Sequence, residues 1–80
     1  MTEKEIIEYA IVGINYSITR CQKRIIRATE YLHEIESGLP TLCKKSKDEL
    51  YEVLCNMRDQ IEELEERRFE LEIKLTEKEN

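Results

Sequence analysis

The chain has 80 residues, of which 39% are charged, and its formal net charge is −5. A chain of this length forms one small domain with a limited core. The acidic balance argues against nucleic acid as the default partner. An uncharged stretch, residues 9–19, is much shorter than the ~20 residues that span a bilayer, so we expect no membrane segment.

The acidic start of the chain lacks a basic n-region, and we therefore expect no signal peptide. The three cysteines, Cys21, Cys43 and Cys55, form no CxxC pair. This pattern is typical of reduced thiols, and it predicts a cytoplasmic protein.

The first predicted element is a helix over about 3–37. Thr2 and Glu5 form a capping box at its start, and Gly38 and Pro40 form a stop after it. Apolar residues follow in alternating steps of four and three, which is the pattern of a coiled-coil seam. They are Ile7, Ile11, Ile14, Ile18, Cys21, Ile25, Ala28, Leu32 and Ile35.

After a loop over 38–46, the sequence predicts a second helix over about 47–78. Ser46 and Glu49 form its capping box. Its seam shows the same alternation of steps, with one charged member. The seam consists of Leu50, Leu54, Met57, Ile61, Leu64, Arg68, Leu71 and Leu75.

A short loop between long helices makes them antiparallel neighbours. Both seams then align in one register, from Leu32 beside Leu50 to Ile7 beside Leu75. The predicted fold is a single all-α domain, an antiparallel two-helix coiled-coil hairpin. A single long helix in an intermolecular coiled coil is the alternative, and the Gly38 to Pro40 stop disfavours it. Because two helices leave their seams half open, we expect self-association or a partner to complete a helical bundle.

One side of the predicted hairpin carries few charges, and we call it the contact face. Its residues on the first helix are Val12, Asn15, Thr19, Gln22, Ile26, Thr29 and His33, and those on the second helix are Tyr51, Cys55 and Phe69. A solvated flank normally carries charges throughout, so this side is typical of a contact surface. The alternative is scattered surface hydrophobes, which are normal.

Three further residues form an outer cluster, which we call the tyrosine cluster: Tyr9, Tyr16 and Ile73. Tyrosine is a common interface anchor, although single exposed tyrosines are ordinary. The predicted partner-binding residues are therefore Tyr9, Val12, Asn15, Tyr16, Thr19, Ile26, Tyr51, Cys55, Phe69 and Ile73. Arg68, opposite Ile14 in the seam, either reaches solvent, Glu65 or Glu72, or specifies the register or partner.

A basic stripe on the first helix consists of Arg20, Lys23, Arg24 and Arg27. Residues 59–80 contain nine acids and four bases, so pairing with Asp59, Glu62 and the acids just beyond them is the structural expectation. Docking of nucleic acid or another anionic partner on the stripe is the functional alternative.

The sequence offers no readable catalytic, metal or cofactor site. It has one histidine, His33, without metal-ligand spacing, and no glycine-rich phosphate loop. We therefore expect no enzyme and no cofactor. The predicted function is non-catalytic protein–protein interaction, as a small adaptor, subunit or regulator. A small inhibitor of a larger enzyme or nucleic-acid machine is the first alternative, and direct nucleic-acid binding is the second. The sequence does not identify the partner or the biological process.

Overall fold

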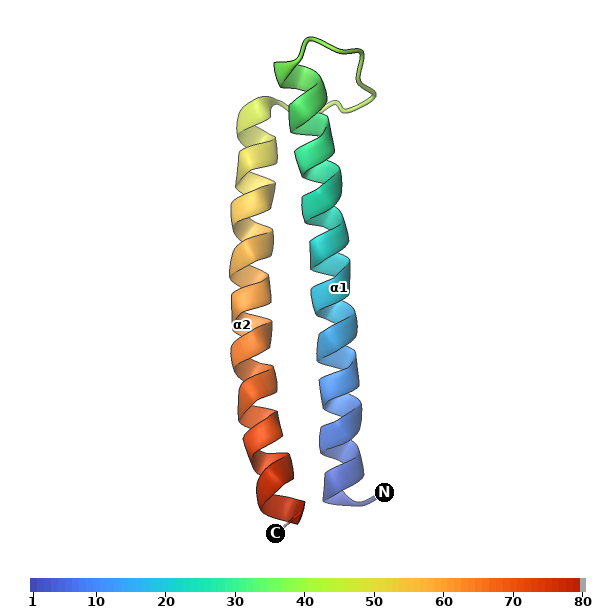
Figure 1. Cartoon of the computed structure of the whole chain (residues 1–80), viewed down its shortest axis with the longest axis vertical. Helices are drawn as coiled ribbons and strands as arrows, with labels where there is room; N and C mark the ends of the chain where they lie inside the picture. The colour runs from blue at the N-terminus through green and yellow to red at the C-terminus, as the bar shows by residue number, and fades with distance from the viewer. Residues whose placement is uncertain (80) are drawn as a thin grey trace.

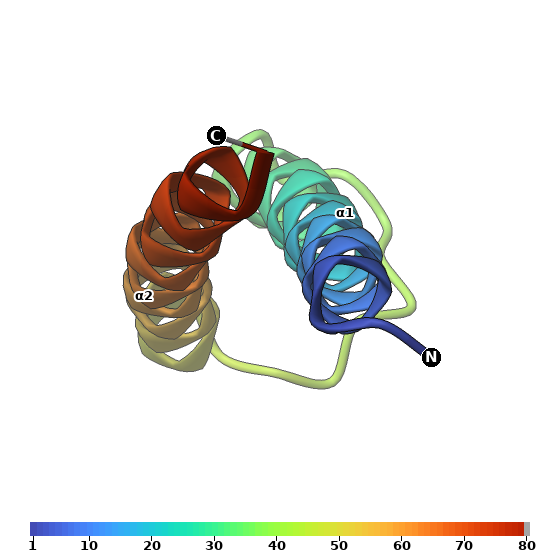
Figure 2. The ribbon, with the colours of Figure 1, turned by 90° about the horizontal axis from the view of Figure 1, so that it is seen from below.

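The computed structural model describes residues 1–79 and contains two helices, α1 (Glu3–Glu36) and α2 (Lys47–Glu79). The helices run antiparallel side by side, so that both chain ends lie at the end opposite the loop (Figure 1). The hairpin measures 57 × 18 × 14 Å. Viewed along its length, the two helices are inclined to each other, as in a coiled coil (Figure 2). The predicted all-α hairpin is confirmed.

Both helices begin where a side-chain hydroxyl accepts a hydrogen bond from the backbone. The Glu5 amide donates to Thr2 Oγ1 at 3.1 Å, and the Glu49 amide donates to Ser46 Oγ at 3.2 Å. Each hydroxyl in turn donates to the carboxylate of the same glutamate, at 3.2 Å in both cases. These contacts satisfy amides that have no partner within the helix, which explains why the helices start at these residues.

A Schellman motif ends α1 one residue earlier than the predicted position 37. Gly38 has a φ of +69°, a backbone conformation that glycine adopts without the steric cost of a Cβ atom. Its amide donates to the Ile35 carbonyl, and the Leu39 amide donates to the Glu34 carbonyl at 2.8 Å. The chain then leaves the helix and loops back to α2.

The predicted seam forms the core, but its two halves differ in burial. Within residues 1–79, the eight buried residues are Ile14, Ile18, Cys21, Ala28, Leu32, Leu50, Leu54 and Met57. Ala28, Leu32, Leu50 and Leu54 pack into one cluster near the loop. Toward the chain ends, the seam residues Ile7, Ile11, Leu64, Leu71 and Leu75 are only half-buried. On α2 the buried part of the seam is thus the half beside the loop, whereas on α1 it extends as far as Ile14, and the seam is partly open beyond these residues.

Polar contacts between the helices agree with the predicted register. Lys78 pairs with Glu3, and Lys4 pairs with Glu79 at 3.6 Å, which ties the chain ends together. Cys21 Sγ donates to Gln60 Oε1 at 3.6 Å in the middle of the hairpin. Each of these contacts joins residues within one position of the predicted pairing, so the register read from the two seams holds over this span.

Candidate interaction surfaces

The ten residues of the contact face are all exposed. The larger apolar members are open to solvent to an extent unusual for their type, with 63% exposure for Val12, 58% for Ile26 and 63% for Phe69. A helical hairpin that presents such side chains along one side leaves apolar area uncovered that a partner can bury.

The α1 part of the contact face carries no formal charge, and two of its hydroxyls are already satisfied. Thr19 Oγ1 donates to the Asn15 carbonyl at 3.0 Å, and Thr29 Oγ1 donates to the Ile25 carbonyl at 2.8 Å. Because these donors bond within their own helix, covering them does not leave them without a partner. On α2 the contact face is interrupted by the exposed charges of Arg58, Glu62 and Glu65, so its least polar part lies on α1.

Asn15 and Arg68 form a contact that sequence reasoning missed. Arg68 Nη1 donates to Asn15 Oδ1 at 2.7 Å, and Arg68 Nε lies 3.8 Å from Glu72 Oε1. The contact with Glu72 was one of the predicted alternatives, whereas the bond to Asn15 crosses between the helices. Arg68 therefore links the two helices of one hairpin, and its apolar stem covers the seam. The predicted register could have revealed this hydrogen bond, because Asn15 is next to Ile14, the predicted partner of Arg68.

Tyr51, at the loop end of the contact face, is held by a hydrogen bond. Its hydroxyl donates to Glu36 Oε1 at 2.8 Å, and Lys47 Nζ lies 3.7 Å from the same oxygen. The bond to the Glu36 carboxylate raises the pKa of Tyr51 above its usual value, because ionisation would remove the donated proton and add a like charge. Tyr51 thus presents a ring whose hydroxyl is hydrogen-bonded, with 46% of the residue exposed.

The tyrosine cluster is also exposed. Tyr9 is 64% exposed, Tyr16 66% and Ile73 44%. The guanidinium group of Arg20 lies 6.0 Å from the centroid of the Tyr16 ring, at the outer limit of a cation–π contact. Tyr16 is therefore in contact with a cation of its own helix, while no such contact is found for Tyr9 within residues 1–79.

The basic stripe does not form the predicted ion pairs. Within the described part of the chain, none of Arg20, Lys23, Arg24 and Arg27 pairs with a carboxylate, so the expected pairing with Asp59, Glu62 and their neighbours is wrong. The reason lies in the residues of α2 that flank the seam on this side. These are Val53, Gln60 and Arg67, and none of them is acidic. Glu63 of α2 also lies on this side, but among residues 1–79 it forms no ion pair with a member of the stripe.

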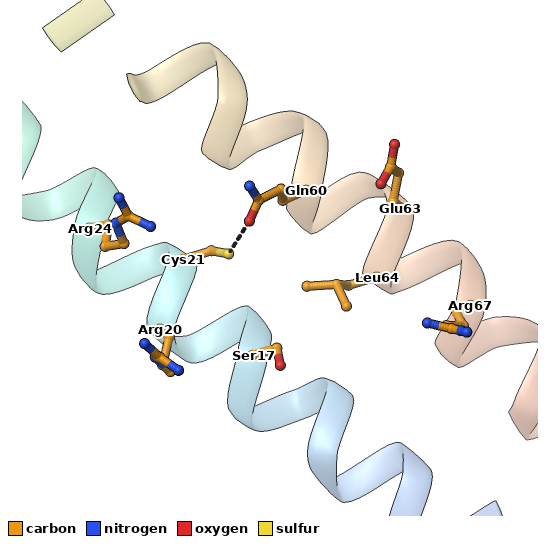
Figure 3. A pocket seen from close by; sticks show the side chains of 8 residues that line it. All are labelled: Ser17, Arg20, Cys21, Arg24, Gln60, Glu63, Leu64 and Arg67. Carbon is orange, nitrogen blue, oxygen red and sulfur yellow. Dashed lines mark hydrogen bonds between the residues drawn. The ribbon is translucent and has the colours of Figure 1, made fainter. Parts of the chain in front are cut away.

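Two adjoining hollows lie on this side of the hairpin and share Arg24, and we call them together the basic groove. The first, of about 420 Å³, is lined by Ser17, Arg20, Cys21, Arg24, Gln60, Glu63, Leu64 and Arg67. Figure 3 shows Arg20 and Arg24 along α1, with Glu63 and Arg67 along α2 and the Cys21–Gln60 bond between the helices. The second, of about 370 Å³, is lined by Arg24, Arg27, Ala28, Tyr31, Leu42, Cys43, Lys44, Lys45, Leu50 and Val53.

Only part of the basic stripe therefore lines the basic groove. Arg20, Arg24 and Arg27 line it, whereas Lys23 lines neither hollow. The two loop lysines that join the arginines, Lys44 and Lys45, follow only from the way the loop folds back, and sequence spacing along α1 could not reveal them. The groove and the contact face have no residue in common.

Neither surface brings together a set of reactive groups. Among residues 1–79, no cluster of three or more His, Cys, Asp and Glu side chains is placed to hold a metal ion. Cys21 is buried, Cys43 half-buried and Cys55 exposed, and each is a free thiol. Over the same range, neither helix is long and apolar enough to cross a membrane. No family model, no curated protein and no solved structure matches this chain.

Proposed function

We propose that this protein is a non-catalytic protein-binding module whose contact face packs against a second helical hairpin, namely another copy of the same chain. The observation that carries the proposal is the exposure of Val12, Ile26 and Phe69 on a side whose α1 part has no charge. The half-buried seam at the open end supports the same conclusion, since a four-helix bundle buries seams that two helices leave open.

The spacing of the contact face supports pairing of two copies about a twofold axis. Val12 and Ile26 lie seven residues before and after Thr19, which is two turns of a coiled-coil helix in either direction. When two α1 helices pack antiparallel about Thr19, Val12 of one copy lies against Ile26 of the other. The same patch then serves both copies, as a twofold interface requires.

The size of this side is sufficient for a stable dimer. A surface of 57 × 18 Å has a footprint of roughly 1,000 Å² per copy, and a typical specific interface buries about 800 Å² per partner. The α1 part of the contact face around Thr19 brings no like charges together. Packing two copies there therefore does not require desolvation of unpaired ions.

Light scattering on the purified chain tests the proposal. We expect a mass of twice the 9.6 kDa chain at micromolar concentration. Ile26→Glu should shift the protein toward monomer, because it buries a charge at the interface without a partner. Glu63→Arg changes an exposed charge in the basic groove and is the matched control, which should remain dimeric. A monomer at every concentration, or equal effects of the two substitutions, would overturn the proposal.

A further inference from the structure

The basic groove is a second surface, on the side of the hairpin that the proposed dimer leaves free. We propose that it binds an acidic amphipathic helix of a partner protein, whose apolar side chains fill the hollow near the loop and whose carboxylates meet the surrounding cations. Since the groove and the contact face share no residue, this inference is independent of the proposed self-association.

The charge of the groove points to an anionic partner. Six cations line it, Arg20, Arg24, Arg27, Lys44, Lys45 and Arg67, against the single acid Glu63. Within residues 1–79, none of the six belongs to an ion pair, although Lys4, Lys47, Arg68 and Lys78 elsewhere in the hairpin all do. Cations gathered in a groove repel one another and raise the local potential. A ligand with carboxylates along its flanks would relieve this repulsion and form charge-assisted hydrogen bonds with the guanidinium groups.

The floor of the hollow beside the loop favours a protein ligand over a single-stranded nucleic acid. It is formed by Ala28, Tyr31, Leu50 and Val53, and Leu42 of the loop stands beside it with 95% of its surface exposed. A groove for single-stranded nucleic acid combines cations with several aromatic rings on which bases stack, whereas this floor is mainly aliphatic and contains one ring. An amphipathic helix uses both properties, because its apolar stripe meets the floor while its charged flanks meet the rim.

The length of the groove sets the length of the ligand. From Ser17 to Tyr31, which line its two ends along α1, fourteen residues of helix cover about 21 Å. A partner helix of about four turns therefore spans the groove. It would carry apolar residues at every third or fourth position, with Glu or Asp on both sides of that stripe.

A designed peptide provides the probe. We would use a fluorescein-labelled 15-residue helix with Leu at positions 4, 7, 8 and 11 and Glu at the flanking positions, and follow its anisotropy on titration with the full chain. The matched peptide has Gln in place of every Glu. We expect the Glu peptide to bind at least tenfold more tightly than the Gln peptide, with an affinity that falls as salt is added.

Substitutions at three exposed side chains test whether the peptide binds in the basic groove. Because these side chains are exposed, their replacement leaves the core intact. Arg27→Gln at the rim and Leu42→Ser beside the floor should each weaken binding of the Glu peptide about tenfold. Lys23→Gln removes a charge of the same sign that lines neither hollow, so it should have no effect. Circular dichroism checks that every variant remains helical.

Two results would overturn the inference. One is equal affinity for the Glu and Gln peptides, or equal loss in Lys23→Gln and Arg27→Gln, which would show that the groove does not act as a site. The other is tighter binding of a 15-nucleotide oligo(dT) than of the Glu peptide with no effect of Leu42→Ser, which would identify a nucleic-acid surface instead.

Discussion

Replacement of Leu50 tests whether the core lies near the loop, as the burial of the seam implies. Leu50 is 2% exposed and is the largest fully buried side chain of the described residues. A Leu→Ala change at such a site costs about 3 kcal/mol, within the 2–5 kcal/mol found for well-packed cores, since it removes apolar contacts and leaves a cavity. A domain of this size has roughly 4–12 kcal/mol of stability in total, so the loss is a large fraction of it.

Leu71→Ala is the matched control, because it makes the same chemical change at a seam position that is only half-buried. Part of the Leu71 side chain already meets water, and no closed cavity forms there, so we expect a loss of about 1.5 kcal/mol. Urea unfolding followed by far-ultraviolet circular dichroism measures both values in the Ile26→Glu background, which we expect to be monomeric, because association adds to stability and would cover the open end of the seam. Equal losses, or a larger loss for Leu71→Ala, would refute the assignment of the core to the loop end.

Three further predictions concern polar and backbone features of the hairpin. In a double-mutant cycle, Arg68→Met and Asn15→Ala should show a coupling of about 1 kcal/mol in the free energy of unfolding, and additive effects would contradict a bond between the helices. Gly38→Ala should lower the free energy of unfolding by about 1 kcal/mol. The cause is backbone strain alone, since no atom beyond the neighbouring residues lies within 4 Å of the added Cβ. An unchanged urea midpoint would contradict this strain. The hydrogen bond from Lys78 lowers the pKa of Glu3 below its ordinary 4.5, so the contribution of this pair is present above that pH and is lost as the pH falls through the folded value. The protection factors of the amides at the chain ends, corrected for the intrinsic exchange rate at each pH, should therefore fall as the pH drops below 4.5. Glu3→Gln should weaken that dependence, and an unchanged dependence would contradict a contribution from the pair.

The fold could be predicted because local and long-range signals agree. The hydroxyl caps, the glycine stop and two seams with the same alternation all indicate one hairpin in one register. The bounds of α1 differ from the prediction by one residue, since Ser37 caps the helix rather than continuing it. Position along a heptad also identifies which side chains are exposed, and the ten predicted partner-binding residues are all exposed.

The polar contacts could be predicted only in part, because a heptad fixes the side of a helix but not the reach of a long side chain. Arg68 extends to Asn15 on the other helix as well as to Glu72 on its own. Among residues 1–79, the arginines of the basic stripe form no ion pair, because Gln60 and Arg67 flank them next to the seam and Glu63, the acid of the same hollow, does not pair with them. The charge totals of the two helices suggested pairing that the described residues do not form.

Cross-linking at Thr19 tests the pairing of two contact faces most directly. In a chain in which Cys43 and Cys55 are replaced by serine and the buried Cys21 is retained, Thr19→Cys places one exposed thiol at the proposed twofold axis. A short bifunctional maleimide should then convert most of the protein into a covalent dimer at micromolar concentration, whereas Glu63→Cys in the same background should remain monomeric on a denaturing gel. Absence of the dimer for Thr19→Cys, or equal yields from the two positions, would contradict the association proposed for this protein.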